Sequence, residues 1–89
     1  MQADKDKVSR LLKTARGQLD GILRMVEEDR YCMDISNQIM ATCAILGKAN
    51  REVIGAHLRS CVQTAMEQGG TEKEQKIQEI LDIIDKATR

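Results

Sequence analysis

Apolar residues recur at alternating spacings of four and three along residues 8–26, and this period constrains the possible folds more than any other feature. A heptad seam of this kind predicts an amphipathic helix that packs against other helices. The chain contains no proline, so nothing of that kind interrupts a helical backbone. We therefore expect an all-α fold. The seam positions are Val8, Leu12, Ala15, Leu19, Ile22 and Val26.

Three helices account for the whole pattern, and we expect them over about residues 4–28, 33–67 and 71–88, with the longest in the middle. The Gly69-Gly70 pair ends the second helix, and Thr71 with Glu74 forms a T-x-x-E capping box that opens the third. Eighty-nine residues form one domain, expected over 1–89, with a core small enough to profit from oligomerisation. The expected seam of the second helix is Ile35, Ile39, Thr42, Leu46, Ala49, Val53, Ala56 and Ser60, and that of the third is Ile77, Ile80, Leu81 and Ile84.

Charge and hydropathy narrow the function classes. The net charge is zero, but basic residues outnumber acidic ones near the start of the chain. The N-terminal residues are polar and no apolar run is long enough to span a membrane, so we expect a cytoplasmic protein. Three cysteines in a reducing compartment favour metal or redox chemistry over structural disulfides. No phosphate loop or nucleophile with a positioned acid is evident, so we do not expect an enzyme.

Cys32, His57 and Cys61 form the most informative group of polar residues. His57 and Cys61 are four residues apart, so they lie one turn apart on the same helix face. Cys32 lies near the start of the same helix, where the backbone field favours a thiolate, roughly 37 Å from His57 along the axis. An antiparallel copy of the helix brings the three together. The spacing therefore predicts a site with two thiolates and one imidazole across a subunit interface.

Two chemistries remain open for such a site. The soft ligands suit Cu(I) or Zn(II), and Cu(I) accepts three ligands whereas Zn(II) generally takes four. Alternatively, two thiols meeting across an interface form a disulfide or carry a persulfide, with His57 idle. Cys43 has no histidine or cysteine at ligand spacing, and we interpret it as a small apolar side chain.

Basic residues on two helices are candidates for contact with DNA, although one such row is more often a solvated face. Arg10, Lys13 and Arg16 follow a spacing of three, with Gln18 near the end of the row. Lys48 and Arg51 repeat this spacing on the second helix. Several copies in an oligomer could neutralise enough phosphates for salt-sensitive binding, with DNA shape supplying specificity.

These motifs together resemble the copper-sensing operon repressors, the CsoR family of bacterial transcriptional regulators. The resemblance covers residues 8–84 and is carried by Arg16–Ile22, Met25–Cys32, Asp34-Ile35, Gln38-Ile39 and His57–Val62. It implies a three-helix protomer, an antiparallel four-helix dimer core and a tetramer that binds operator DNA. It also implies Cu(I) held by Cys32 of one protomer and by His57 and Cys61 of another, with Tyr31 and Glu74 beside the ligands.

The branches of the family differ in the residues that bind their inducer, and the residues of this chain favour the copper-sensing branch. Nickel and cobalt sensors add histidines, and this chain has one histidine. Formaldehyde sensors use an N-terminal proline, which is absent here. Persulfide sensors usually lose the histidine, so His57 favours a Cu(I)-responsive repressor that releases DNA when copper binds. A persulfide or thiol-redox sensor using Cys32 and Cys61 is the alternative, and a plain helical interaction module is a third.

Overall fold

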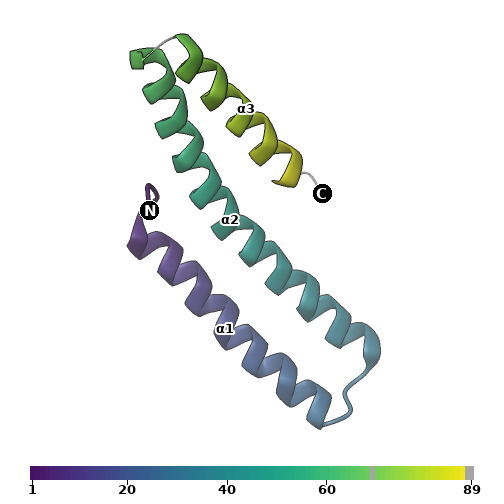
Figure 1. The fold of residues 1–89 in the computed structure, drawn as a ribbon. Helices are drawn as coiled ribbons and strands as arrows, with labels where there is room; N and C mark the ends of the chain where they lie inside the picture. Colours follow the sequence, from purple (N-terminus) through teal and green to yellow (C-terminus); the bar gives the residue numbers. More distant parts are fainter. Residues whose placement is uncertain (69, 88–89) are drawn as a thin grey trace. The chain divides into compact units, whose positions relative to one another are not determined.

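The computed structural model describes residues 1–68 and 70–87, except for the side chains of residues 68, 71–73, 84 and 87. It contains three α-helices, α1 (Lys5–Glu27), α2 (Cys32–Gln68) and α3 (Gly70–Ala87), and these residues include no strand (Figure 1). The prediction of an all-α protomer with a long central helix is confirmed. The helix ends differ from the expected ones by one residue, and the expected last residue, Thr88, lies outside the described residues.

The chain divides into two compact units. The N-terminal unit comprises Asp4–Glu52, and the C-terminal unit comprises Val53–Arg89 together with Met1–Ala3. Helix α2 contributes to both, because it continues without a break from Cys32 to Gln68. The single domain expected over residues 1–89 stays a prediction.

Local hydrogen bonds fix where α1 begins and ends. The Asp4 side chain caps α1 by accepting from the backbone N–H groups of Asp6 and Lys7, at 3.0 and 3.3 Å. At the other end the N–H of Arg30 donates to the carbonyl of Met25, and Asp29 adopts a φ of 52°. This is a Schellman ending, with aspartate at the left-handed position that glycine usually occupies. The ending reverses the chain, so Cys32 becomes the first residue of α2.

Two contacts define how α1 and α2 pair in the N-terminal unit. The Thr42 hydroxyl donates to the Gln18 side-chain oxygen at 2.8 Å, and Lys7 Nζ lies 3.0 Å from Glu52 Oε1. Residues early in α1 therefore face residues late in this part of α2, so the two helices are antiparallel. Thr42 is 3% exposed, which makes its hydrogen bond a specific link between the helices.

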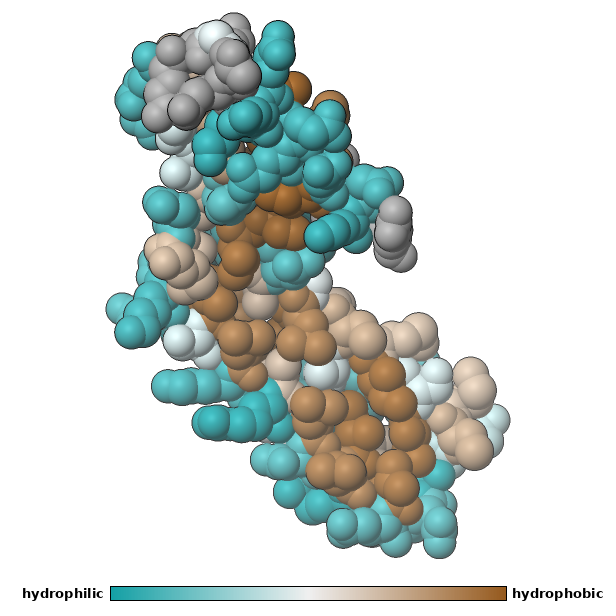
Figure 2. Space-filling view, viewed as in Figure 1, coloured by the Kyte–Doolittle hydropathy of each residue, from teal (hydrophilic) through white to brown (hydrophobic). Residues whose placement is uncertain are grey.

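The predicted seams of α1 and α2 are only partly buried. In α1 every seventh residue, Val8, Ala15 and Ile22, is buried, and Thr42 and Ala49 are buried at the same spacing in α2. The alternate seam positions remain about half exposed. Figure 2 shows apolar atoms gathered on the visible face of the N-terminal unit. We use the name open seam for the following exposed apolar side chains of α1 and α2 in this unit: Leu12, Leu19, Leu23, Val26, Ile39, Met40 and Leu46.

The buried contact of Thr42 predicts a measurable loss of stability on substitution. Thr42→Val keeps the side-chain volume but leaves the Gln18 oxygen without its donor, at a cost of about 1–2 kcal/mol. The urea unfolding midpoint should fall accordingly. Adding Gln18→Leu removes the orphaned acceptor, so the double variant should lose less than the single one. An unchanged midpoint for Thr42→Val would show that this hydrogen bond adds nothing.

Among the described side chains, the half-buried face of α3 shares only Ile80 with the expected stripe. Ile80 and Ile83 are half-buried together with Lys76 and Glu79, whereas Ile77 and Leu81 of the expected stripe are 45% and 53% exposed. The side chain of Ile84, the last member of the expected stripe, lies outside the described residues. So does the side chain of Thr71, on which the expected capping box depends. Gly70, with a φ of 59°, has the left-handed backbone that a glycine tolerates where one helix stops. In the described residues no helix is long and apolar enough to cross a membrane.

Candidate metal centre

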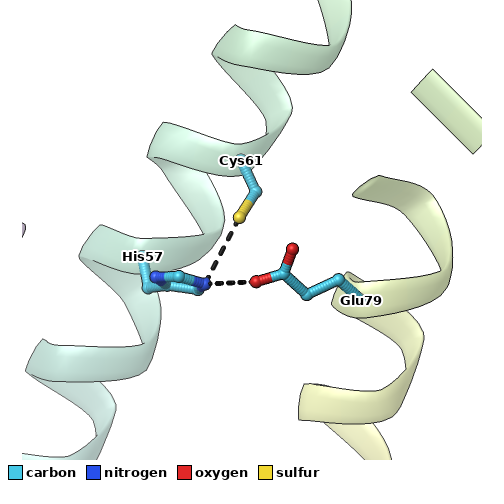
Figure 3. Close-up of side chains that lie close together, drawn as sticks. All are labelled: His57, Cys61 and Glu79. Atoms are coloured by element: carbon cyan, nitrogen blue, oxygen red, sulfur yellow. Dashed lines mark hydrogen bonds and ion pairs between the residues drawn. The ribbon is translucent and has the colours of Figure 1, made fainter. Parts of the chain in front are cut away.

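One turn of α2 in the C-terminal unit brings His57 and Cys61 together. The four-residue spacing stacks the two side chains, and His57 Nε2 lies 3.4 Å from Cys61 Sγ (Figure 3). Cys61 is 5% exposed, whereas the His57 side chain is 44% exposed. A soft nitrogen and a soft sulfur donor are therefore adjacent at the edge of a packed helix pair, where a further ligand can reach the ring.

Glu79 of α3 completes a group of three potential ligands. Its Oε1 lies 2.9 Å from His57 Nε2, and ligand atoms of Glu79, His57 and Cys61 all lie within 4.8 Å of one another. Lys76, one turn earlier on α3, approaches the other carboxylate oxygen at 3.4 Å. The hydrogen bond from His57, and then the charge of Lys76, hold the pKa of Glu79 below its ordinary value near 4.5. Glu79 is thus a carboxylate positioned to orient the imidazole.

The lowered pKa of Glu79 gives a prediction for the metal-free protein. A carboxyl whose pKa is lowered by folding stabilises the fold above its ordinary pKa, and that contribution is lost as pH falls through the lowered value. A carboxyl-carbon NMR titration should place the Glu79 midpoint below 4.5. His57→Ala should raise the midpoint more than Lys76→Gln does, because the histidine hydrogen bond is the larger cause. Equal midpoints in the wild type and His57→Ala would contradict this contact.

The other residues of the predicted site lie elsewhere. Cys32 is exposed at the first residue of α2, in the N-terminal unit, and Tyr31 before it is 68% exposed. The cluster found among the described residues contains Glu79 in the place where we expected a second cysteine. Glu74 is exposed on α3, and its role beside the ligands stays a prediction. Sequence reasoning missed Glu79 because the apolar period of α3 indicated a different inward face.

The residues predicted to contact DNA are all on the N-terminal unit. Five of them have exposed side chains, and among the described residues these five take part in no ion pair: Arg10, Lys13, Arg16, Lys48 and Arg51. Gln18 differs, because it is half-buried and its oxygen accepts from Thr42 of α2. The row of cations on α1 is therefore available to a polyanion, while Gln18 already serves the packing of two helices.

The chain belongs to the metal-sensitive transcriptional repressor family, whose model matches residues 4–86. It is 44% identical over 73 residues to the copper-sensing transcriptional repressor CsoR of Mycobacterium tuberculosis strain H37Rv, covering 82% of this chain. The chain spans 60% of the length of that relative.

Two further similarities cover nearly all of the chain. The copper-sensing repressor CsoR of Bacillus subtilis strain 168 is 40% identical over 86 residues, covering 97% of this chain and 83% of the relative. Among solved structures, the nickel-responsive transcriptional regulator InrS matches with a TM-score of 0.85 and 25% identity, over 98% of this chain and 96% of that one. The resemblance drawn from the sequence motifs is confirmed, and the relatives are regulators rather than enzymes.

Proposed function

We propose that this protein is a Cu(I)-responsive transcriptional repressor whose metal-free form binds operator DNA and whose copper-bound form releases it. The observation that carries the proposal is the pair of soft donors, His57 and Cys61, one helix turn apart with Glu79 against the ring. Relatives that are 40–44% identical and are named copper-sensing repressors support the choice of metal. A repressor that binds operator DNA would be located with that DNA, which agrees with the cytoplasmic location expected from the sequence.

The donor chemistry fits Cu(I) better than a hard cation. When bound, Cu(I) supplies a soft ion that two thiolates and one imidazole can hold jointly. A carboxylate is a harder donor, so we assign Glu79 to the ring rather than to the metal. In the metal-free protein Glu79 accepts from Nε2–H, the ring nitrogen that lies beside Cys61 Sγ, so the lone pair of His57 is on Nδ1. Nδ1 would then be the nitrogen that binds Cu(I), with the ring turned to bring it toward Cys61. Nickel is disfavoured because the chain offers a single imidazole.

The third ligand in this proposal is Cys32 of a second protomer. His57 comes twenty-five positions after Cys32 on one continuous helix, so the thiol at the start of α2 needs an antiparallel partner to meet the imidazole. Cys32 is exposed and unbonded, as an intermolecular ligand must be before the partner is in place. The site then contains one ligand from one subunit and two from the other.

The open seam supports a second copy as that partner. It consists of alternate positions of two heptad patterns together with Leu23 and Met40, and side chains at the heptad positions meet another helix pair in a four-helix bundle. Each leucine that becomes buried contributes about 1.5–3 kcal/mol. A monomer would leave all seven side chains of the open seam about half exposed to water. We propose an antiparallel dimer with a four-helix core, and a tetramer formed by two dimers.

The exposed cations of the N-terminal unit are the proposed DNA surface. Arg10, Lys13 and Arg16 repeat once in every protomer, as do Lys48 and Arg51. In a tetramer this repetition neutralises many phosphates and releases their counterions, so affinity should fall steeply with salt. DNA binding and Cu(I) binding are then coupled by linkage. If Cu(I) lowers the affinity of the protein for DNA by some factor, DNA lowers its affinity for Cu(I) by the same factor.

An anaerobic titration tests the proposal. Cu(I) is added to the reduced protein in the presence of a competing chelator, while fluorescence anisotropy follows a labelled operator duplex. We expect one tight Cu(I) per protomer, X-ray absorption consistent with two sulfurs and one nitrogen, and loss of anisotropy at that stoichiometry. Weak Cu(I) binding, together with DNA release and a Cys32–Cys61 crosslink after polysulfide treatment, would instead favour the sulfur sensor. Failure to retain any duplex at low salt would favour the plain interaction module.

A further inference from the structure

The first turns of α1 carry a shallow hollow of about 330 Å³ lined by Lys7, Arg10, Leu11 and Thr14. It lies wholly within the N-terminal unit, next to the row of exposed cations. Of the lining residues Leu11 is half-buried, while Lys7, Arg10 and Thr14 are exposed. Two cations at a spacing of three on one helix face make such a hollow suitable for a singly charged, oxygen-rich anion.

The groups around the hollow are not equally available. The Thr14 hydroxyl donates to the carbonyl of Arg10 at 2.9 Å, so its hydrogen is already used. Lys7 Nζ is paired with Glu52 Oε1 at 3.0 Å, and the two side chains are 49% and 32% exposed. The guanidinium of Arg10 has no ion-pair partner within the described part of the chain. Among the described residues, the hollow therefore has one cation without an ion-pair partner, Arg10, and one cation, Lys7, whose charge is paired with Glu52 of α2.

We propose that this hollow binds a phosphate of the DNA backbone, and that Glu52 weakens the contact by holding Lys7. The proposal rests on the DNA-binding function proposed above and extends it to a named contact and its restraint. Arg10 has the planar, forked donor geometry that suits phosphate oxygens, and Lys7 adds a point charge beside it. Glu52 cancels that point charge in the free protein. Because an exposed ion pair is weak, Glu52 attenuates DNA binding without abolishing it.

The consequence is that removing one carboxylate should tighten DNA binding. Glu52→Gln frees Lys7 and adds one cation per protomer to the DNA surface. For each additional phosphate contact the logarithm of affinity should fall more steeply with the logarithm of salt, by about 0.9. Between about 50 and 200 mM salt this slope corresponds to a roughly threefold difference per contact. Arg10→Gln should move affinity and slope in the opposite direction.

The experiment uses the full-length protein and a fluorescein-labelled duplex of arbitrary sequence, because a phosphate contact does not depend on sequence. Affinity is measured by anisotropy across the salt series for the wild type, Arg10→Gln, Glu52→Gln and Lys7→Gln/Glu52→Gln. The matched control is Glu28→Gln, which removes the same charge from another ion pair of this unit, that with Arg30 at 3.9 Å. We expect tighter binding only for Glu52→Gln, and near wild-type affinity for the Lys7→Gln/Glu52→Gln double variant.

The outcomes separate this proposal from the one it rests on. If the wild type retains no duplex at low salt, the DNA-binding function itself is wrong. If the wild type binds DNA but Glu52→Gln is no tighter than Glu28→Gln, or Arg10→Gln equals the wild type, the hollow is not a phosphate site and Glu52 restrains nothing. Circular dichroism and sedimentation check that each variant keeps its fold and oligomeric state. Glu52→Ala replaces Glu52→Gln if the glutamine variant does not.

Discussion

Replacing Cys32 by alanine is expected to produce a repressor that still binds DNA and no longer responds to copper. Cys32 is exposed, so its loss should change the folded protomer little. In the proposed site it is one of three ligands and the one that joins the subunits. Loss of a ligand should cost more than the 10–100-fold typical of groups behind the ligands. Cu(I) affinity should therefore fall by more than about a hundredfold, and copper-induced release should disappear.

The chain supplies a matched control for this substitution. Cys43→Ala removes another exposed thiol from the same helix, and it should leave both Cu(I) affinity and release unchanged. His57→Ala should behave like Cys32→Ala although it acts in the other unit, because the site needs both. Anisotropy with a labelled operator, before and after Cu(I), measures DNA binding and release in one titration. Normal release in both Cys32→Ala and His57→Ala would eliminate the proposed switch.

Leu23→Arg is expected to dissociate the oligomer, with an effect far larger than the structure of one protomer would predict. Leu23 is 59% exposed in the protomer, where a surface substitution changes stability by about 0.5 kcal/mol or less. In a two-fold dimer the change occurs twice, and each buried leucine is worth about 1.5–3 kcal/mol. The dimer dissociation constant should therefore rise by about two to four orders of magnitude.

Sedimentation velocity across a concentration series measures this shift, and thermal unfolding should become more dependent on concentration. Ala41→Arg is the control, because it introduces the same charge at an exposed position of α2, about 200° around the helix from Ile39 and about 100° from Met40. It should sediment like the wild type. A Leu23→Arg variant that also sediments like the wild type would show that the open seam is not covered by a second copy.

The helices themselves could be predicted closely from the sequence because their signals are local. The heptad spacing of α1, the absence of proline and the glycine pair at the junction of α2 and α3 depend on residues within one or two turns. The structure consequently differs from the predicted ends by one residue. The pairing of His57 with Cys61 was equally local, since a spacing of four on any helix brings two side chains together.

Features that depend on how two helices pack together could not be predicted from local sequence signals. An apolar stripe shows that a helix has an inner face, but not which half of the stripe meets the neighbour in the same chain. Leu12 and Leu19 are therefore half exposed, although Val8 and Ala15 of the same seam are buried. The contact of Glu79 with His57 and that of Glu52 with Lys7 arise from the register of two helices, which no local spacing determines.

A subunit-mixing experiment tests the shared site most directly. Cys32→Ala and the double variant His57→Ala/Cys61→Ala each lack part of every site, so neither should bind Cu(I) tightly alone. After the two proteins are mixed and allowed to exchange subunits, half of the dimers contain one of each, and each mixed dimer has one complete site. We predict recovery of tight Cu(I) binding at about one quarter of the wild-type stoichiometry. No recovery after proven subunit exchange, or tight binding by Cys32→Ala alone, would contradict a site shared between subunits.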